Sequence, residues 1–219
     1  MNTTVSPIVH IIDDEASLRT AVSRLLAVSG YRVATYESAD QFLQSPNKHE
    51  PGCILLDNNM PGQSGEQLQA RLAQEHCALP IVFLTGQASI AMSVRAIKAG
   101  AEDFLAKPVD KTDLLAAIQR ALERYAANHT QQAQLQEWRR RVALLTARES
   151  EVFKLVIVGL LNKQIAYQLG NAERTVKAHR HSIMEKMQVK SVADLVSIAS
   201  QLGILQDSST GHHGAESRT

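Results

Sequence analysis

Short apolar runs alternate five times with longer amphipathic stretches over residues 1–122, and this alternation constrains the fold more than any other feature of the chain. Short, nearly continuous apolar runs indicate buried parallel strands, and the amphipathic stretches indicate the crossover helices between them. Right-handed crossovers then give an α/β domain with a doubly wound five-stranded parallel sheet. We predict strands near residues 7–12, 31–36, 52–57, 80–85 and 102–107, and helices near 15–29, 38–45, 64–75, 89–99 and 110–122.

Polar side chains stand where four of these apolar runs end. They are Asp13 and Asp14 after the first run, Asp57 after the third, Thr85 after the fourth and Lys107 after the fifth. Ligands of an open parallel sheet bind beyond the carboxyl ends of its strands, so we expect these five side chains to converge. Three carboxylates, a hydroxyl and an ammonium suit a divalent cation and a phosphoryl group.

Each residue type has a chemical role in such a site. The carboxylates of Asp13, Asp14 and Asp57 are hard oxygen ligands of the kind that Mg²⁺ prefers. Asp57 ends the central strand and is the best placed nucleophile, because a carboxylate can form an acyl phosphate. Lys107 would neutralise charge on the phosphate, and the Thr85 hydroxyl would donate a hydrogen bond to a phosphoryl oxygen.

The second half of the chain differs in charge and in periodicity. The net charge of the whole chain is +1, but residues 1–122 carry 10 Lys or Arg against 13 Asp or Glu, whereas residues 123–219 carry 13 against 9. A basic second half suggests a polyanionic partner for that half alone. Residues 146–205 have all-helical periodicity, and Thr146 with Glu149 fits a capping box at the start of the first helix.

A stretch without Gly or Pro joins the two halves. Residues 123–145 continue the last helix of the first domain, and apolar residues keep a heptad-like spacing on both sides of a polar segment at 128–132. This pattern fits a short coiled coil and a solvated helical linker equally well. Residues 206–219 are rich in Ser, Gly and His, so we expect a disordered tail.

Two helices joined by a tight turn within 146–205 suggest a helix-turn-helix. A helix near 162–169 is followed by Gly170, and the next helix would bury Val176, Ile183 and Met187. The alternative on this pattern is a small helical bundle with a solvated cationic face. The opposite face of the second helix carries Arg174, Lys177, Ala178 and His181, with Arg180 beside them. We expect these five residues to contact double-stranded DNA when the helix enters the major groove.

The motifs of both halves resemble known families. The first half is similar to the receiver domain of two-component response regulators, in segments 11–15, 57–65, 84–86, 94–104 and 105–108. The second half resembles the LuxR-type helix-turn-helix of the NarL/FixJ family, in segments 145–149, 159–166, 169–170, 173–180 and 184–187. The resemblance implies a flavodoxin-like receiver over residues 1–122, a DNA-binding domain over 146–205, and a regulator of the FixJ-like branch.

The resemblance also implies partners and ligands. A sensor histidine kinase would supply the phosphoryl group to Asp57. Asp14 and Asp57 would ligate Mg²⁺ together with the backbone carbonyl of Asn59, and Asp13 would help through water. Phosphorylation would activate transcription regulation at promoter DNA, by releasing the DNA-binding domain, by forming a homodimer, or by both.

The same resemblance makes Thr85 and Phe104 a switch pair, in which Thr85 moves toward the phosphoryl group and Phe104 turns inward. Two positions depart from the usual pattern. Relatives often have Gly-His-Gly-Asp from residue 86, where this chain has Gly-Gln-Ala-Ser, and the side chains at 59 and 87 would influence the lifetime of the acyl phosphate. Relatives also usually have Ser where this chain has Ala172, a poorer N-cap by roughly 0.5–2 kcal/mol.

Other protein classes fit the sequence less well. Aspartate-dependent phosphohydrolases generally need a second acid two residues after the nucleophile, where this chain has Asn59. The intact Asp57, Thr85 and Lys107 argue against a phosphorylation-independent interaction module. We therefore expect a phosphoacceptor with at most slow autodephosphorylation rather than an enzyme. Because the N-terminus lacks signal-peptide features and no apolar run could span a bilayer, we expect a cytoplasmic protein without membrane contact.

Overall fold

The computed structural model describes residues 6–86 and 90–205, so the expectations for residue 87 and for the tail at 206–219 lie outside the described residues. The chain forms two compact units, Met1–His129 and Thr130–Thr219, called here the first and the second unit. Within the described ranges, no helix combines the length and the apolar character needed to cross a membrane.

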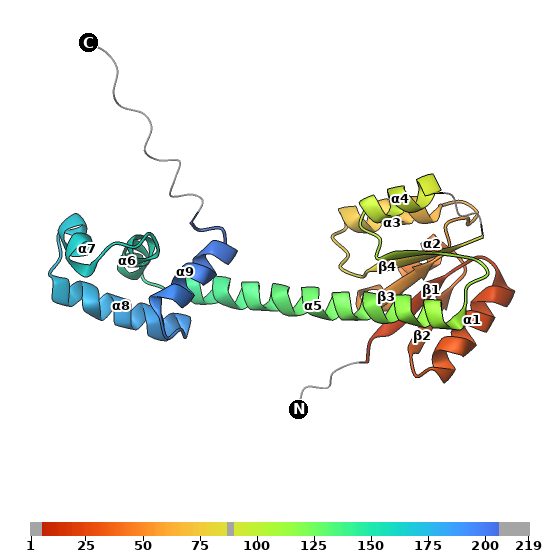
Figure 1. The fold of residues 1–219 in the computed structure, drawn as a ribbon, viewed down its shortest axis with the longest axis horizontal. Coiled ribbons are helices and arrows are strands. Elements are labelled where there is room, and N and C mark those ends of the chain that lie inside the picture. The colour runs from red at the N-terminus through yellow and green to blue at the C-terminus, as the bar shows by residue number, and fades with distance from the viewer. Residues whose placement is uncertain (1–5, 87–89, 206–219) are drawn as a thin grey trace, which may run out of the picture. The chain divides into compact units, whose positions relative to one another are not determined.

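The first unit contains a five-stranded sheet in the order β2-β1-β3-β4-β5 (Figure 1). All of its strand pairs are parallel, which confirms the predicted doubly wound sheet. Every residue of β1, β3 and β4 is buried, as expected of strands that are covered on both faces. The strands are β1 (Ile8–Ile12), β2 (Arg32–Tyr36), β3 (Gly52–Leu56), β4 (Ile81–Thr85) and β5 (Asp103–Ala106).

Helices cover both faces of this sheet. On one face, α1 (Ala16–Val28) and the start of α5 (Lys111–Ala143) pack on alternate residues of the central strands, among them Leu55 and Val82. On the other face, α2 (Ala39–Gln44), α3 (Gly65–Gln74) and α4 (Ile90–Lys98) pack around residues such as Ile54 and Phe83. A short 3₁₀ helix, η1 (Pro46–His49), leads into β3.

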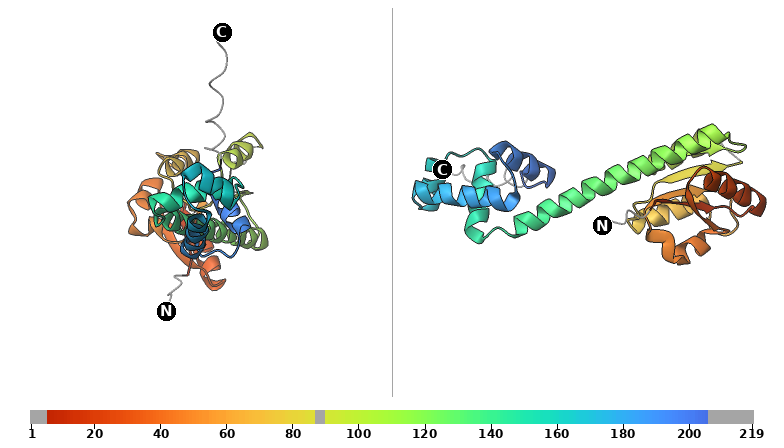
Figure 2. Two further views of the ribbon diagram at one scale, coloured as in Figure 1. Left: turned by 90° about the vertical axis from the view of Figure 1, so that its left-hand side faces the viewer. Right: turned by 90° about the horizontal axis from the view of Figure 1, so that it is seen from below.

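Helix α5 is continuous over its 33 residues (Figure 2). Leu114 and Ile118 near its start are buried in the first unit, and Trp138 and Val142 near its end pack against the core of the second unit. Residues 126–134 between them are all exposed. The polar segment at 128–132 therefore does not interrupt the helix.

Over its described residues, up to 205, the second unit contains the end of α5 and four further helices, α6 (Ala147–Ile157), α7 (Asn162–Leu169), α8 (Glu173–Met187) and α9 (Val192–Gln201). The Thr146 hydroxyl accepts from the Glu149 N–H at 3.2 Å and Glu149 accepts from the Thr146 N–H at 2.7 Å, which confirms the predicted capping box. Gly170 has a φ of 63°, a left-handed conformation that Gly adopts readily, and this allows the tight turn between α7 and α8.

Candidate functional sites

The polar residues at the strand ends lie at one edge of the sheet. Asp13 directly follows β1 and Asp57 directly follows β3, and these strands are neighbours. The Asp57 N–H donates to the carbonyl of Ile12 at 2.8 Å, and the Lys107 N–H donates to the carbonyl of Thr85 at 2.8 Å. These bonds extend the strand pairing by one step, so the backbone holds the side chains at a common edge.

The Lys107 ammonium contacts two of the carboxylates. Its Nζ lies 2.8 Å from Asp13 Oδ2 and 3.3 Å from Asp57 Oδ2, and all three side chains are largely buried. Burial alone would lower the pKa of Lys107, but the hydrogen bond and charge of Asp13, followed by those of Asp57, outweigh it and raise the pKa. Lys107 is therefore a charged ammonium at the carboxyl ends of the strands.

Asp57 is held less tightly than Asp13. Its Oδ1 accepts a long hydrogen bond of 3.4 Å from the Asn59 N–H, whereas Asp13 Oδ1 accepts from the Glu15 N–H at 2.8 Å. Burial raises the pKa of Asp57, the charge of Lys107 and the Asn59 N–H lower it, and the charge of Asp13 raises it further; the net direction is upward. A second cation beside Asp57 would therefore relieve an unfavourable concentration of negative charge.

The carboxylates also fit a divalent cation. Oxygens of Asp13, Asp14 and Asp57 all lie within 4.8 Å of one another. Asp14 is exposed while the other two are buried, so the group opens toward solvent. All three donors are hard oxygens, as Mg²⁺ prefers, and solvent access suits an ion that keeps several of its waters.

Thr85 and Phe104 lie on the same face of neighbouring strands. Phe83 is paired with Phe104 in the sheet register, and their ring centroids are 6.0 Å apart. Thr85 comes two residues after Phe83 and so points to the same face. Thr85 is completely buried and Phe104 is half-buried, so the Phe104 ring is partly accessible in this structure.

Two residues beside Asp57 lie within the segment 57–65 that resembles receiver domains, but the sequence predicted no role for either. Asn58 is buried, its Oδ1 accepts from the Glu66 N–H at 3.0 Å, and its Nδ2 lies 3.4 Å from the sulfur of Met92 in α4. At Gly65, a Cβ would lie 2.6 Å from the carbonyl oxygen of Asp57. The close approach of α3 to β3 requires this glycine. Neither residue has a spacing that distinguishes it from the other residues between β3 and the start of α3.

The structure places the predicted DNA-contacting residues on α8. Val176, Ile183 and Met187 are completely buried, which confirms the predicted inner face. Ala172 provides no side-chain cap, yet α8 begins directly after it, with Glu173 in the first turn, where a negative charge is favourable. On the opposite side, four of the candidates are exposed: Arg174, Lys177, Ala178 and His181. Arg180 is half-buried and lies nearer the buried face of α8.

Polar contacts hold the end of α8 in place. Glu149 is 5% exposed and accepts from Ser182 at 2.7 Å and from Lys186 at 2.5 Å. Burial would raise the pKa of Glu149, but the hydrogen bonds of Lys186, Ser182 and Thr146 outweigh it and lower the pKa to about 2. From α5, the Arg141 guanidinium donates to the carbonyl oxygen of Met187 at 3.0 Å.

Comparison with known proteins gives matches over both units. The family model of the response regulator receiver domain matches residues 9–119, and that of the bacterial regulatory proteins of the luxR family matches residues 143–199. The response regulator protein TmoT of Ectopseudomonas mendocina is 42% identical over 195 residues, which are 89% of each chain. The solved structure of the response regulator StyR is similar with a TM-score of 0.80 and 42% identity, over 90% of this chain and 100% of that one. Full-length FixJ from B. japonicum is similar with a TM-score of 0.57 and 34% identity, over 92% of this chain and 99% of that one.

Proposed function

Because the chain belongs to the two-component response regulators with a LuxR-type DNA-binding domain, we propose that Asp57 accepts a phosphoryl group from a sensor histidine kinase and thereby controls binding to promoter DNA. The observation that carries this proposal is the contact of Lys107 with both Asp13 and Asp57 at the carboxyl ends of the strands. A buried carboxylate beside a fixed ammonium is equipped to receive a phosphoryl group whose negative charge must be compensated.

In the transfer, a carboxylate oxygen of Asp57 attacks the phosphorus atom of the kinase phosphohistidine. The oxygen–phosphorus bond forms as the nitrogen–phosphorus bond breaks, and the electron pair of that bond returns to the imidazole. Lys107 stabilises the negative charge on the phosphoryl oxygens, and the Thr85 hydroxyl donates a hydrogen bond to one of them. Lys107 already contacts Asp57, and Thr85 ends β4, the strand next to β3.

Mg²⁺ would be held by Asp14, Asp57 and the backbone carbonyl of Asn59, and it would supply positive charge to the phosphoryl oxygens. Asp13 would act through a water molecule, because its Oδ1 accepts from Glu15 and its Oδ2 contacts Lys107. The exposed Asn59 side chain borders the approach of water to the acyl phosphate, so it would influence slow autodephosphorylation.

Control of DNA binding follows if the first unit has two conformations and phosphorylation of Asp57 favours one of them. Thr85 moves toward the phosphoryl group and the half-buried Phe104 turns inward, which changes the surface around α4 and β5. This change promotes a homodimer or frees the DNA-binding domain. We assign the receiver to residues 1–122, the helical linker to 123–145 and the DNA-binding domain to 146–205, where α8 reads DNA with the residues of its outer side. The function is exercised at promoter DNA in the cytoplasm.

Incubation with acetyl phosphate and Mg²⁺, followed by intact mass measurement, tests the assignment of Asp57. The wild-type chain should gain one phosphoryl group, and Asp57→Asn should gain none. Asp40→Asn is the matched control, because Asp40 is an exposed aspartate of α2 and should leave the reaction unchanged. Phosphate incorporation that persists in Asp57→Asn would contradict the assignment. DNA-binding titrations of the phosphorylated and the unphosphorylated protein then test whether the modification controls DNA binding by the second unit.

A further inference from the structure

The side-chain amide of Asn58 has a fixed orientation. Asn58 is 5% exposed, and one end of its amide lies 3.0 Å from the backbone nitrogen of Glu66 in the first turn of α3. Because a backbone N–H only donates, this end of the amide must be the oxygen, Oδ1. The other end, Nδ2, is therefore a donor, and it lies 3.4 Å from Asn59 Oδ1 and 3.4 Å from the sulfur of Met92.

This contact also orients the amide of Asn59. Because Asn58 Nδ2 only donates, the end of the Asn59 side chain that faces it must be the oxygen. The Asn59 N–H donates to Asp57 Oδ1 at 3.4 Å, while the Asn59 side chain is exposed. Asn59 therefore lies on the solvent side of Asp57, with its amide oxygen turned toward Asn58.

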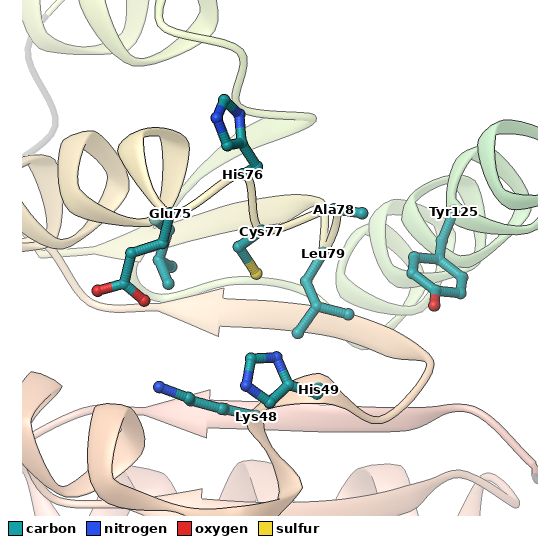
Figure 3. Close-up of a pocket in the computed structure, with 9 residues that line it drawn as sticks. Lys48, His49, Glu75, His76, Cys77, Ala78, Leu79 and Tyr125 are labelled. Carbon is teal, nitrogen blue, oxygen red and sulfur yellow. The ribbon is translucent and has the colours of Figure 1, made fainter. Parts of the chain in front are cut away.

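Water approaches Asp57 from the carboxyl ends of the strands, where Asp14 and Asn59 are exposed. The pocket in Figure 3 lies at the opposite edge of the sheet, because Lys48 precedes β3 and Cys77 precedes β4. The five residues of β3 separate this pocket from Asp57, so water in the pocket does not reach the phosphoacceptor.

Hydrolysis of an acyl phosphate on Asp57 is assisted by a hydrogen-bond acceptor beside the attacking water. The water oxygen bonds to phosphorus, the bond between phosphorus and the Asp57 oxygen breaks, and the electron pair of that bond returns to the carboxylate. The proton that the water loses leaves with the inorganic phosphate. Aspartate-dependent phosphohydrolases generally have an acid two residues after the nucleophile, where a side-chain oxygen can accept from this water. In this chain the corresponding oxygen is Asn59 Oδ1.

We propose that Asn58 is a positioning residue that prolongs the life of the acyl phosphate, because it holds the amide oxygen of Asn59 away from the attacking water. Asn59 then presents its NH₂ group to the site, and this group cannot accept a hydrogen bond from water. The inference rests on the proposed phosphorylation of Asp57. It makes the lifetime of the phosphorylated state depend on a buried side chain that does not itself touch the phosphoryl group.

The rate of dephosphorylation tests the proposal. Full-length wild type and Asn58→Leu are phosphorylated with acetyl phosphate and Mg²⁺, desalted to remove the donor, and followed by intact mass measurement. Leu has nearly the shape of Asn but cannot donate, so Asn59 becomes free to turn. The variant should lose its phosphoryl group about threefold to tenfold faster, which is the bias that one hydrogen bond gives to two orientations. Its rate of phosphorylation should stay that of the wild type, because that step uses no attacking water.

Three further variants separate this role from a structural one. Asn58→Asp keeps an oxygen for the Glu66 N–H but lacks the donor, so it should also accelerate dephosphorylation. In an Asn59→Ala background there is no amide to orient, and Asn58→Leu should no longer change the rate. Gln69→Met is the matched control, because Gln69 is 4% exposed and its Nε2 donates to the carbonyl of Ala96 in α4 at 3.1 Å. This variant removes another buried amide that reaches α4 and should dephosphorylate as the wild type does.

The proposal is overturned if phosphorylated Asn58→Leu and Asn58→Asp keep the wild-type rate of dephosphorylation. It is also overturned if Asn58→Leu accelerates the reaction equally in the Asn59→Ala background, or if Gln69→Met accelerates it as much. A wild-type chain that gains no phosphoryl group would instead refute the proposed function, and this inference with it.

Discussion

Lys186→Met is expected to destabilise the second unit more than Glu149→Gln, although both substitutions break the same ion pair. The side chain of Glu149 is 6% exposed and that of Lys186 is 33% exposed. Without Glu149, the ammonium can turn toward water. Without Lys186, a buried carboxylate keeps only its hydrogen bonds from Ser182 and Thr146. The asymmetry follows because an unpaired charge costs most where water cannot reach it.

The magnitude follows from the pKa of Glu149, which folding lowers from 4.5 to about 2. This difference in pKa corresponds to about 3 kcal/mol of folding free energy. Because the Lys186 side chain is 33% exposed, solvent screens the ion pair and reduces its contribution to roughly 1–2 kcal/mol. We expect a loss of about 1 kcal/mol for Glu149→Gln and about 2–3 kcal/mol for Lys186→Met. The double variant should lose less than the sum of the two, by roughly 1–2 kcal/mol.

The same ion pair has a predictable pH dependence. The folded-state pKa of Glu149 lies below its unfolded value, so the stabilisation is complete above pH 4.5 and is lost as the pH falls toward 2. Glu149→Gln removes this contribution, because its side chain does not titrate. The free energy of unfolding of the variant should therefore fall less steeply in this range than that of the wild type.

Urea unfolding of the full chain, followed by the fluorescence of Trp138, measures these differences. Trp138 is the single tryptophan and packs against the core of the second unit, so its emission reports the unfolding of that unit. Glu151→Gln is the control, because Glu151 pairs with Arg148 on the exposed surface and should change stability by less than about 0.5 kcal/mol. Equal losses for Lys186→Met and Glu149→Gln, with an additive double variant, would refute the reasoning.

Three further predictions concern other parts of the chain. Gly65→Ala should destabilise the first unit by about 2–3 kcal/mol in scanning calorimetry, because its Cβ would lie 2.6 Å from the carbonyl oxygen of Asp57; an unchanged transition temperature would contradict this. Burial lowers the pKa of His10 from 6.5 to about 4, so the free energy of unfolding of the first unit should fall by up to about 3 kcal/mol as the pH falls through this range. This loss of stability should be absent in His10→Gln. If Lys177 and Arg180 contact phosphates, replacement of either by Ala should flatten the slope of log affinity against log salt concentration by about 1. The loss of a base contact should instead cost roughly 1–3 kcal/mol of binding free energy at one operator position. Unchanged affinity of both variants for DNA would exclude α8 as the helix that reads the operator.

The sequence predicted those features that depend on periodicity. The run from Cys53 to Leu56 is apolar at every position because β3 is covered on both faces, and this run also predicted that Asp57 would stand at the end of a central strand. The burial of Asn58 was not predictable, because it depends on how closely the first turn of α3 approaches β3. The contact of Glu149 with Lys186 joins residues 37 positions apart, and no local pattern indicates that these two charges meet.

The end of α5 has a consequence for the exchange of domains between regulators. Trp138 packs against the core of the second unit and Arg141 donates a hydrogen bond to the last turn of α8, so the final turns of α5 form part of the fold that contains α8. A recombination at residue 145 would separate these side chains from the core against which they pack. A crossover within the exposed stretch 126–134 would leave both cores intact. In hybrid regulators of this kind, natural or constructed, viable junctions should therefore concentrate inside the helix rather than at its end.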